Sequence, residues 1–219
     1  MIMKNRSSWI TWVALVLPFA YLAWIWSRLP RQVPLHWNWK GEVDRYGSKY
    51  ELILIPLLMP VLIWAIFRIV PLIDPKGRAA QSGGKYWALG NLMTWFMSIL
   101  ALYILYTAAH PGAFRLEFLL CLTGLLFALF GNYAPTLRPN YFIGIRTPWT
   151  LENPDVWRST HRMAGKWWMT GGLLLVAICP FLSRRLYLIL WIMIMASLVL
   201  VPVIYSYVQF KKVQKKEAI

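Results

Sequence analysis

Residues 186–208 read LYLILWIMIMASLVLVPVIYSYV, without an Asp, Glu, Lys or Arg among them. A helix needs roughly 20 mostly apolar residues to cross the hydrocarbon layer of a membrane, and this stretch is long enough. The basic tail KKVQKK follows at 211–216 and is typical of a cytoplasmic anchor. The end of the chain is therefore predicted to be a membrane-spanning helix with a cytoplasmic tail.

The rest of the chain repeats this pattern. Of the 219 residues, 59% are hydrophobic and only 14% are charged, which is too little polar surface for a soluble domain. Many of the 14 tryptophans stand at the ends of apolar runs, where indole favours the headgroup level. We therefore expect an all-α integral membrane protein with six transmembrane helices. Besides Leu186–Val208, the expected spans are Trp9–Trp26, Leu52–Val70, Trp87–Ala109, Leu116–Ala134 and Trp167–Leu182.

The first span imitates a signal peptide, but it is long for one and no small-residue cleavage site follows it. We interpret it as a retained helix. Pro56, Pro60 and Pro202 lie inside predicted spans, where local kinks are expected. Cys121 and Cys179 also fall inside spans and are interpreted as buried apolar residues, without a disulfide framework or a metal-ligand spacing.

The distribution of Lys and Arg predicts the orientation. With the N-terminus inside, the cytoplasmic segments hold most of the 23 basic residues, including Lys4, Arg6, Lys76 and Arg78. Both termini are therefore expected to be cytoplasmic. The formal net charge of +15 lies beside apolar spans, so anionic membrane lipid is the simpler partner and no direct nucleic-acid binding is expected.

Two connections are too long to be simple linkers, and long ordered loops are often functional. We expect an N-terminal three-span half at 1–109 with an extracellular loop at 28–51, and a C-terminal three-span half at 110–219 with a cytoplasmic loop at 135–166. Both halves read helix, long loop, helix, helix. This pattern suggests an inverted repeat of the kind found in transporters, although no repeat of residues supports it.

The outer loop alternates in a way that favours an extended chain. Pro30 and Pro34 prevent helix continuation, and Leu35–Trp39 suits a short strand. Gly41 and Gly47 are predicted to mark turns. Two interpretations are open for the polar residues of this loop. They either have a functional role, or they form hydrogen bonds with nearby backbone N–H groups in tight turns.

The inner loop contains a helix start at Asn153, where a capping residue is followed by Pro154. In the following helix, one face is expected to carry Trp157, His161, Gly165 and Trp168. Another face is basic and carries Arg158, Arg162 and Lys166. Lipid headgroup contact explains the basic face most simply. The tryptophan and histidine face is open to either packing on the bundle or binding of a ligand.

These two loops together resemble the SdpI family of bacterial membrane proteins. The outer loop is similar to a small domain of unknown function that opens many members, through Leu29-Pro30, Pro34, His36-Trp37-Asn38, Gly41, Asp44 and Lys49. The inner loop resembles the family's own signature, through Asn140, Gly144-Ile145-Arg146-Thr147, Trp149-Thr150-Leu151, Val156-Trp157, Thr160-His161-Arg162 and Gly165. Leu137-Arg138-Pro139 before Asn140 departs from the pattern in a minor way.

The resemblance implies a multi-pass protein of the bacterial plasma (inner) membrane that confers immunity to a secreted, membrane-active killing peptide. It also implies signal transduction, in which a cytoplasmic transcriptional repressor is held at the membrane. The candidate binding residues of the outer loop are His36, Trp37, Asn38, Gly41, Asp44 and Lys49. Those of the inner loop are Asn140, Gly144, Arg146, Thr147, Trp157, His161, Arg162 and Gly165.

Two alternatives to immunity remain open. A small membrane transporter or exporter is supported by the repeated loop pattern, but the spans carry almost no charged residue near mid-membrane. A membrane-embedded enzyme is less favoured, because a layer of about 30 Å separates the acid–base residues of the two loops. We therefore expect no enzyme activity, no cofactor and no metal site.

Overall fold

The computed structural model describes residues 9–74 and 84–217, and the chain is the all-α multi-pass membrane protein expected. Within the described residues, six helices are long and apolar enough to cross a membrane. They are Trp9–Arg28, Lys49–Ile73, Gly84–Ala109, Leu116–Thr136, Pro154–Phe181 and Arg184–Lys216. The basic residues Lys4, Arg6, Lys76 and Arg78, used above to predict the orientation, lie outside the described residues.

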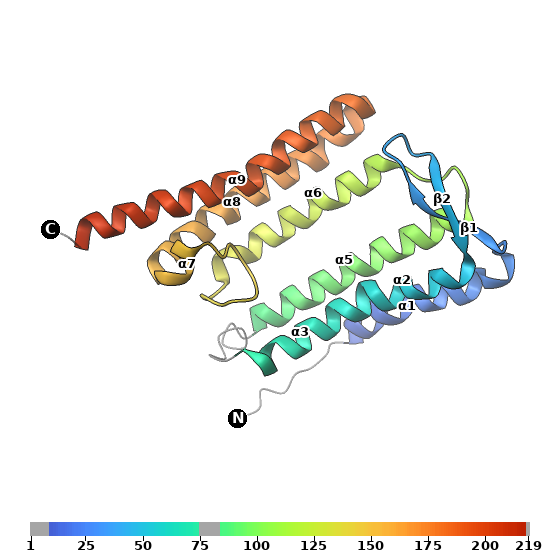
Figure 1. Ribbon diagram of the computed structural model, residues 1–219, viewed down its shortest axis with the longest axis horizontal. Helices are drawn as coiled ribbons and strands as arrows, with labels where there is room; N and C mark the ends of the chain where they lie inside the picture. The colour runs from blue at the N-terminus through green and yellow to red at the C-terminus, as the bar shows by residue number, and fades with distance from the viewer. Residues whose placement is uncertain (1–8, 75–83, 218–219) are drawn as a thin grey trace. The chain divides into compact units, whose positions relative to one another are not determined.

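The chain divides into two compact units, Met1–Ile69 with Gly90–Leu116, and Val70–Leu89 with Glu117–Ile219. Figure 1 labels their elements. The elements of the first unit, some of which continue into the second, are α1 (Trp9–Ile25), η1 (Trp26–Arg28), β1 (Gln32–Trp37), β2 (Val43–Ser48), η2 (Lys49–Ile53), α2 (Leu54–Pro56), η3 (Leu57–Val61), α3 (Leu62–Ile73) and α5 (Gly84–Ala109). Those of the second unit are α6 (Leu116–Tyr133), η4 (Ala134–Thr136), α7 (Pro148–Glu152), α8 (Pro154–Ile178), η5 (Cys179–Phe181) and α9 (Arg184–Glu217).

Strands β1 and β2 form an antiparallel hairpin in the first unit, which we call the hairpin. Its apolar side chains pack into a hydrophobic cluster. The helices contribute to this cluster through the C-terminal part of α1, through η2 and through the C-terminal part of α5. The buried members of that cluster are Leu22, Ile25, Leu29, Val33, Leu52, Leu105 and Ala108. The expected strand at Leu35–Trp39 therefore exists, but it begins earlier, at Gln32, because Val33 belongs to this core.

The second span of the first unit is not a regular α-helix throughout. Its turn at Leu57–Val61 is π-helical and contains Pro60. Proline has no backbone N–H and cannot make the bond to the carbonyl four residues earlier. A wider turn is one way for the chain to continue past it.

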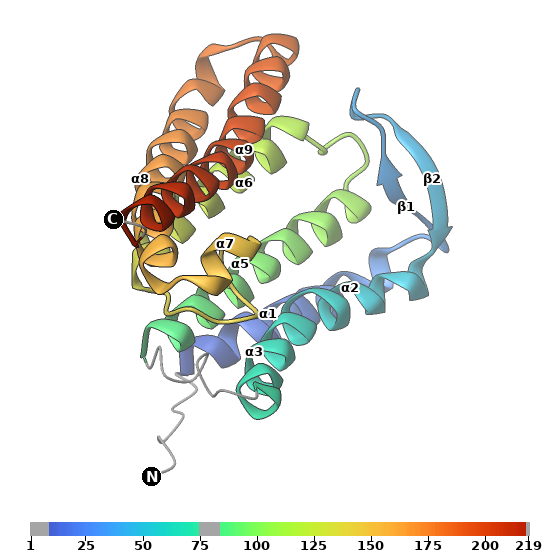
Figure 2. The same cartoon turned by 60° about the vertical axis from the view of Figure 1, so that its left-hand side comes forward.

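In the second unit, α6 and α8 are antiparallel and touch through glycines (Figures 1 and 2). A Cβ atom built on Gly172 would lie 2.4 Å from the carbonyl oxygen of Gly124. A Cβ on Gly131 would lie 2.6 Å from the carbonyl oxygen of Gly165. We call these four glycines the glycine seam. Small residues allow membrane helices to approach closely enough for backbone-to-backbone packing.

Helix α9 packs along α8 on a different side from the seam (Figure 2). The indole N–H of Trp168 donates to the Leu198 carbonyl at 2.7 Å, which ties the two helices together near the middle of α8. Ala134 and Ala164 join these two residues in one buried cluster. The second unit is thus a three-helix assembly around α8.

Two expectations need correction. Gly47 lies inside β2 and not in a turn, because a Cβ there would meet the Leu35 side chain at 2.2 Å. The inner loop does not extend from 135 to 166, because α8 begins at Pro154 and continues without a break to Ile178. The fifth span is therefore longer than the expected Trp167–Leu182. The helix start expected at Asn153 is confirmed, since its side chain accepts from the N–H groups of Asp155 and Val156.

Candidate functional site

The tip of the hairpin is built by Asn38 and Gly41. The Asn38 side-chain oxygen accepts from the backbone N–H of Lys40 at 2.9 Å and of Glu42 at 3.1 Å. Gly41 has a φ of +85°, a conformation that L side chains rarely adopt, and its N–H donates to the Asn38 carbonyl at 2.9 Å. These two candidates therefore shape the turn.

Two more outer candidates attach the hairpin to the helices. The Trp37 ring stacks on Phe114 with 5.1 Å between ring centroids and only 5° between planes. The Lys49 ammonium donates to the Trp26 carbonyl at 3.3 Å and lies 4.7 Å from the centroid of the Trp26 ring. The hairpin is thus fixed by aromatic stacking on one side and by a cation over an aromatic ring on the other.

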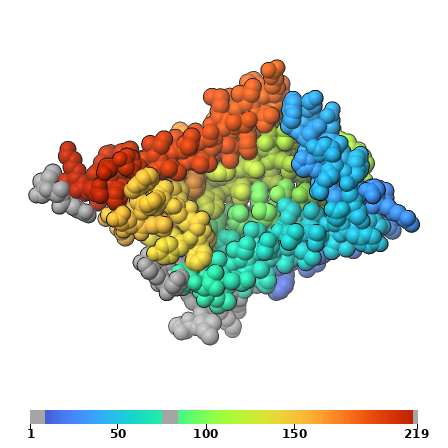
Figure 3. Space-filling view, viewed as in Figure 1, coloured from blue at the N-terminus to red at the C-terminus, as the bar shows by residue number. Residues whose placement is uncertain are grey.

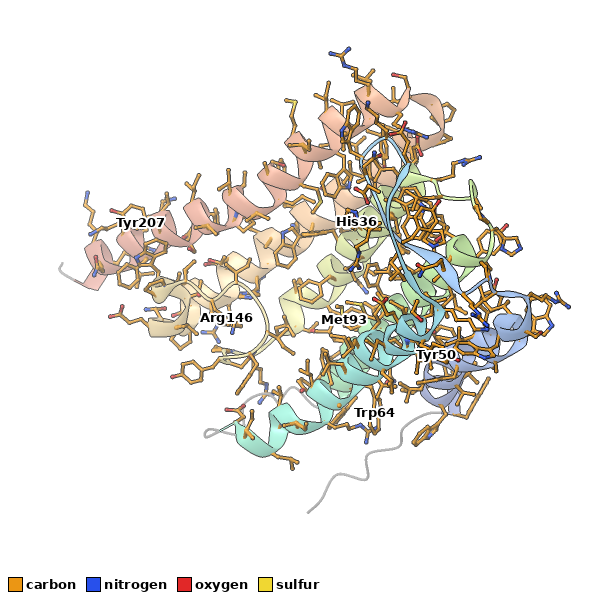
Figure 4. The ribbon with its side chains drawn as sticks, turned by 45° about the vertical axis from the view of Figure 1, so that its right-hand side comes forward. His36, Tyr50, Trp64, Met93, Arg146 and Tyr207 are labelled. Atoms are coloured by element: carbon orange, nitrogen blue, oxygen red, sulfur yellow. The ribbon has the colours of Figure 1, made fainter. Side chains whose placement is uncertain are left out.

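The remaining outer candidates lie on the open face of the hairpin. The His36 Nδ1 and Asp44 Oδ1 atoms are 2.5 Å apart, and both side chains are largely exposed. Tyr46, two residues after Asp44 in β2, is exposed as well. We call His36, Asp44, Tyr46 and the exposed tip residue Trp39 the hairpin face. Figure 3 shows the hairpin in blue at the surface, and Figure 4 labels His36.

The hairpin face combines exposed aromatic rings with a paired charge. Trp39 is 65% exposed and Tyr46 is 60% exposed. Tyrosine and tryptophan present an apolar body together with a polar group, which is the surface chemistry suited to an amphipathic partner at the edge of a membrane. Within the described ranges, no group of three or more His, Cys, Asp or Glu side chains is placed to hold a metal ion.

The inner candidates lie in the second unit, in and around residues 137–153, which we call the signature loop. Asn140 is buried, and its side-chain oxygen accepts from the N–H groups of Phe142 and Ile143 at 2.8 Å and 2.7 Å. Its amide donates to the carbonyls of Arg138 and Ile143. All its polar capacity is used inside the loop, so Asn140 folds the loop and offers nothing outward.

Trp157 and His161 hold the signature loop against α8. Their rings stack with centroids 4.0 Å apart, and both residues are almost fully buried. The Trp157 indole N–H donates to the Leu137 carbonyl at 2.8 Å. The His161 Nε2 atom accepts from the Ile145 N–H at 2.9 Å, so the proton of the neutral ring sits on Nδ1 and points to the Trp157 carbonyl.

Gly144 and Gly165 are needed for this packing. A Cβ on Gly144 would lie 2.4 Å from the His161 Nε2 atom, and its φ of +113° excludes most other residues. Gly165 belongs to the glycine seam on the next turns of α8. Both are therefore explained by close approach to a neighbour.

Thr147 caps α7 and links it to α9. Its hydroxyl accepts from the Thr150 N–H at 3.3 Å and lies 3.1 Å from the Ser206 hydroxyl. Sequence reasoning missed Ser206, which is fully buried near the C-terminal end of α9. The available signal was a small hydroxyl-bearing residue inside a largely apolar span, a type of residue that often bonds across membrane helices.

Only Arg146 and Arg162 of the inner candidates are exposed. The Arg146 guanidinium donates to the Tyr141 carbonyl at 2.5 Å, and its position ahead of α7 is visible in Figure 4. Arg162 lies on the basic face of α8 together with Arg158 and Lys166, as the sequence predicts. The signature loop is therefore internally braced, with cations on its surface.

Replacing His161 by phenylalanine is expected to lower the free energy of unfolding by about 1–3 kcal/mol, because the buried Ile145 N–H loses its acceptor. Denaturation of the purified protein in mixed micelles measures the loss. His110→Phe is the matched control, since His110 also contacts the carbonyl four residues earlier but is exposed. Equal stability of the two variants would contradict the bracing role.

The six apolar helices define a multi-pass membrane protein, with one hairpin and one braced loop between its spans. Residues 136–206, from the signature loop to α9, match the SdpI/YfhL protein family. Residues 13–59, from α1 through the hairpin, match a domain of unknown function, DUF1648. The resemblance to the SdpI family is thereby confirmed.

Two relatives extend these matches. The chain is 23% identical over 208 residues to the Immunity protein SdpI of Bacillus subtilis, covering 93% of this chain and 95% of that protein. It is 38% identical over 90 residues to an uncharacterized protein of Archaeoglobus fulgidus, covering 40% of this chain and 44% of the other. No solved structure matches the chain significantly. The homology supports an immunity-type function in the family.

Proposed function

We propose that this chain is an immunity protein that protects the cell from a secreted, membrane-active killing peptide. The observation that carries the proposal is the match to an immunity protein along 93% of the chain. That match includes the spans, the hairpin and the signature loop together. Proteins of this family are not known as enzymes, which fits a protective role based on binding.

The hairpin face is the proposed contact surface for the peptide. Six crossings would place the connection after the first span and the connection after the fourth span on opposite sides of the membrane. The basic tail of α9 favours a cytoplasmic C-terminus and therefore an extracellular hairpin. A secreted peptide would then meet Trp39, Tyr46 and the His36–Asp44 pair at the membrane surface before it reaches the lipid.

Expression of the chain in a sensitive bacterium tests the proposal. We expect survival at concentrations of a membrane-active killing peptide that kill cells carrying an empty plasmid. Replacement of His36, Trp39 and Asp44 by alanine should lower the tolerated peptide concentration at least about tenfold, equal to about 1.4 kcal/mol of binding free energy. The exposed His36–Asp44 contact contributes little to folding, so the amount of protein in the membrane should stay the same.

Phe181→Ala is the matched control for this experiment. Phe181 is an aromatic residue with 83% exposure that lies between α8 and α9, outside the hairpin face. Its removal should leave protection unchanged. Killing of cells that contain normal amounts of the wild-type chain, across a panel of such peptides, would contradict immunity. Full protection by the triple variant would contradict the hairpin face as the contact surface.

A linked proposal is that the chain relays the presence of the toxin to a cytoplasmic repressor. Its support is the braced signature loop, which carries the exposed Arg146, together with the exposed Arg162 on the first turns of α8. A repressor encoded beside this gene and fused to a fluorescent protein should move to the membrane when the peptide is added. Alanine at both arginines should abolish the movement, and an unchanged cytoplasmic distribution in wild-type cells would contradict the relay.

A further inference from the structure

A hollow of about 420 Å³ lies beside the first two turns of α8. One wall is formed by residues 135–139, which follow α6, and the other by Pro154 and Arg158 of α8. Proline residues at 135, 139 and 154 restrict the backbone of both walls. The Trp157 indole holds the Leu137 carbonyl, so the two walls are tied together by a buried hydrogen bond.

Two guanidinium groups line this hollow. Arg138 belongs to the first wall and Arg158 to the second, and both residues are exposed. The Arg158 guanidinium pairs with the Asp155 carboxylate, which occupies part of its donors. A guanidinium has five N–H donors, so Arg158 keeps further N–H groups for an anion while Arg138 supplies the second charge.

The position of the hollow at the ends of two spans fits the depth of the lipid phosphates. The fourth span ends at Thr136 and the fifth begins at Pro154, and both residues line the hollow. The end of a spanning helix marks the passage from hydrocarbon to headgroups. Basic pockets between membrane helices at this level bind anionic headgroups.

We propose that this hollow binds the phosphate group of an anionic phospholipid, clamped between Arg138 and Arg158. The planar guanidinium matches phosphate oxygens with two parallel N–H bonds, which favours arginine over lysine at such a site. The site consists of second-unit residues alone and does not depend on the proposed immunity function. A bound lipid would also fix the entry of the signature loop, since Arg138 belongs to it.

Native mass spectrometry of the full chain tests the proposal. The protein is released from detergent with increasing amounts of phosphatidylglycerol, and the bound fraction is counted. We expect the double variant Arg138→Gln, Arg158→Gln to bind this lipid about tenfold more weakly, because charge-assisted hydrogen bonds are lost. The double lysine variant keeps the charge and should recover only part of the affinity. Lys215→Gln, which removes one charge from the end of α9, should bind like wild type.

Further arms distinguish the possible sources of the phosphate. Phosphatidylcholine should bind more weakly than phosphatidylglycerol, and millimolar inorganic phosphate should not replace the lipid. Size-exclusion profiles confirm that each variant remains folded. Unchanged lipid binding by the double glutamine variant would overturn the proposal. So would a site filled by inorganic phosphate in preference to lipid.

Discussion

Replacing Gly172 by leucine is expected to separate α6 from α8 and to remove most of the folded protein from the membrane. A Cβ at Gly172 would meet the Gly124 carbonyl oxygen at 2.4 Å and the Ala128 nitrogen at 2.5 Å. Both are backbone atoms in a helix, so they cannot turn aside as a side chain can. We expect a loss of at least about 3 kcal/mol in the free energy of unfolding, at the upper end of what overpacking costs.

Gly84→Leu is the matched control for this variant. A Cβ at Gly84, the first residue of α5, would have no neighbour within 4 Å. Leucine is also a better helix former than glycine by roughly 1 kcal/mol, so propensity alone would stabilise both variants. Denaturation in mixed micelles and the amount of protein in the membrane separate the two effects. Wild-type stability of the Gly172 variant would show that the glycine seam does not carry the packing of the second unit.

Replacing Trp157 by alanine is expected to cost about 3–5 kcal/mol, the usual range for a fully buried tryptophan. The substitution leaves a cavity beneath the signature loop and frees the Leu137 carbonyl from the indole. Trp157→Phe keeps much of the ring but leaves the buried Leu137 carbonyl without its donor, so it should cost about 1–3 kcal/mol. The free energies of unfolding of the wild type and the two variants, measured by denaturation, separate the cost of the cavity from the cost of the lost hydrogen bond.

Trp9→Ala provides the comparison for this series. Trp9 is 75% exposed at the start of α1, and its removal should change stability by less than about 0.5 kcal/mol. If the Trp157 and Trp9 variants were equally stable, Trp157 could not be the brace of the signature loop. It would then have to be reconsidered as a residue that contacts a partner.

The spans were predictable because membrane crossing depends on length and apolarity, which the sequence displays directly. The start of α8 was predictable from the cap at Asn153, but the continuity of α8 was not. In the sequence, the basic residues on the first turns of α8 are typical of a loop. Only the packing of the opposite face, through Trp157 and His161, shows that these turns belong to the helix of the fifth span.

The hairpin was predictable only in part. The alternation in β1 indicates a strand, whereas β2 reads VDRYGS and carries no apolar alternation of its own. The pairing of β2 with β1 depends on the turn at Asn38 and on the close packing of Gly47 against the Leu35 side chain. The residue pattern of β2 alone shows neither contact. For the same reason Gly47 looked like a turn residue although it lies in a strand.

The candidate residues were easier to find than to interpret. The family resemblance selected Asn140, Trp157 and His161, but the residues themselves could not distinguish a binding role from a structural one. Their hydrogen bonds and burial assign them to bracing. The partner Ser206 lies 59 residues from Thr147 and was invisible to local pattern reasoning. The glycine seam was also missed, although its pairs share a seven-residue spacing on α6 and α8.

Photo-crosslinking from the hairpin tip tests the central claim most directly. A benzophenone amino acid replaces Trp39 in one protein and Tyr207, near the C-terminal end of α9, in another. Both original side chains are exposed aromatics, so the probe is tolerated at either position. Under conditions in which the cells are protected, illumination should link the killing peptide to position 39 and not to position 207. Protected cells in which position 39 forms no adduct, or no more than position 207, would contradict contact at the hairpin face.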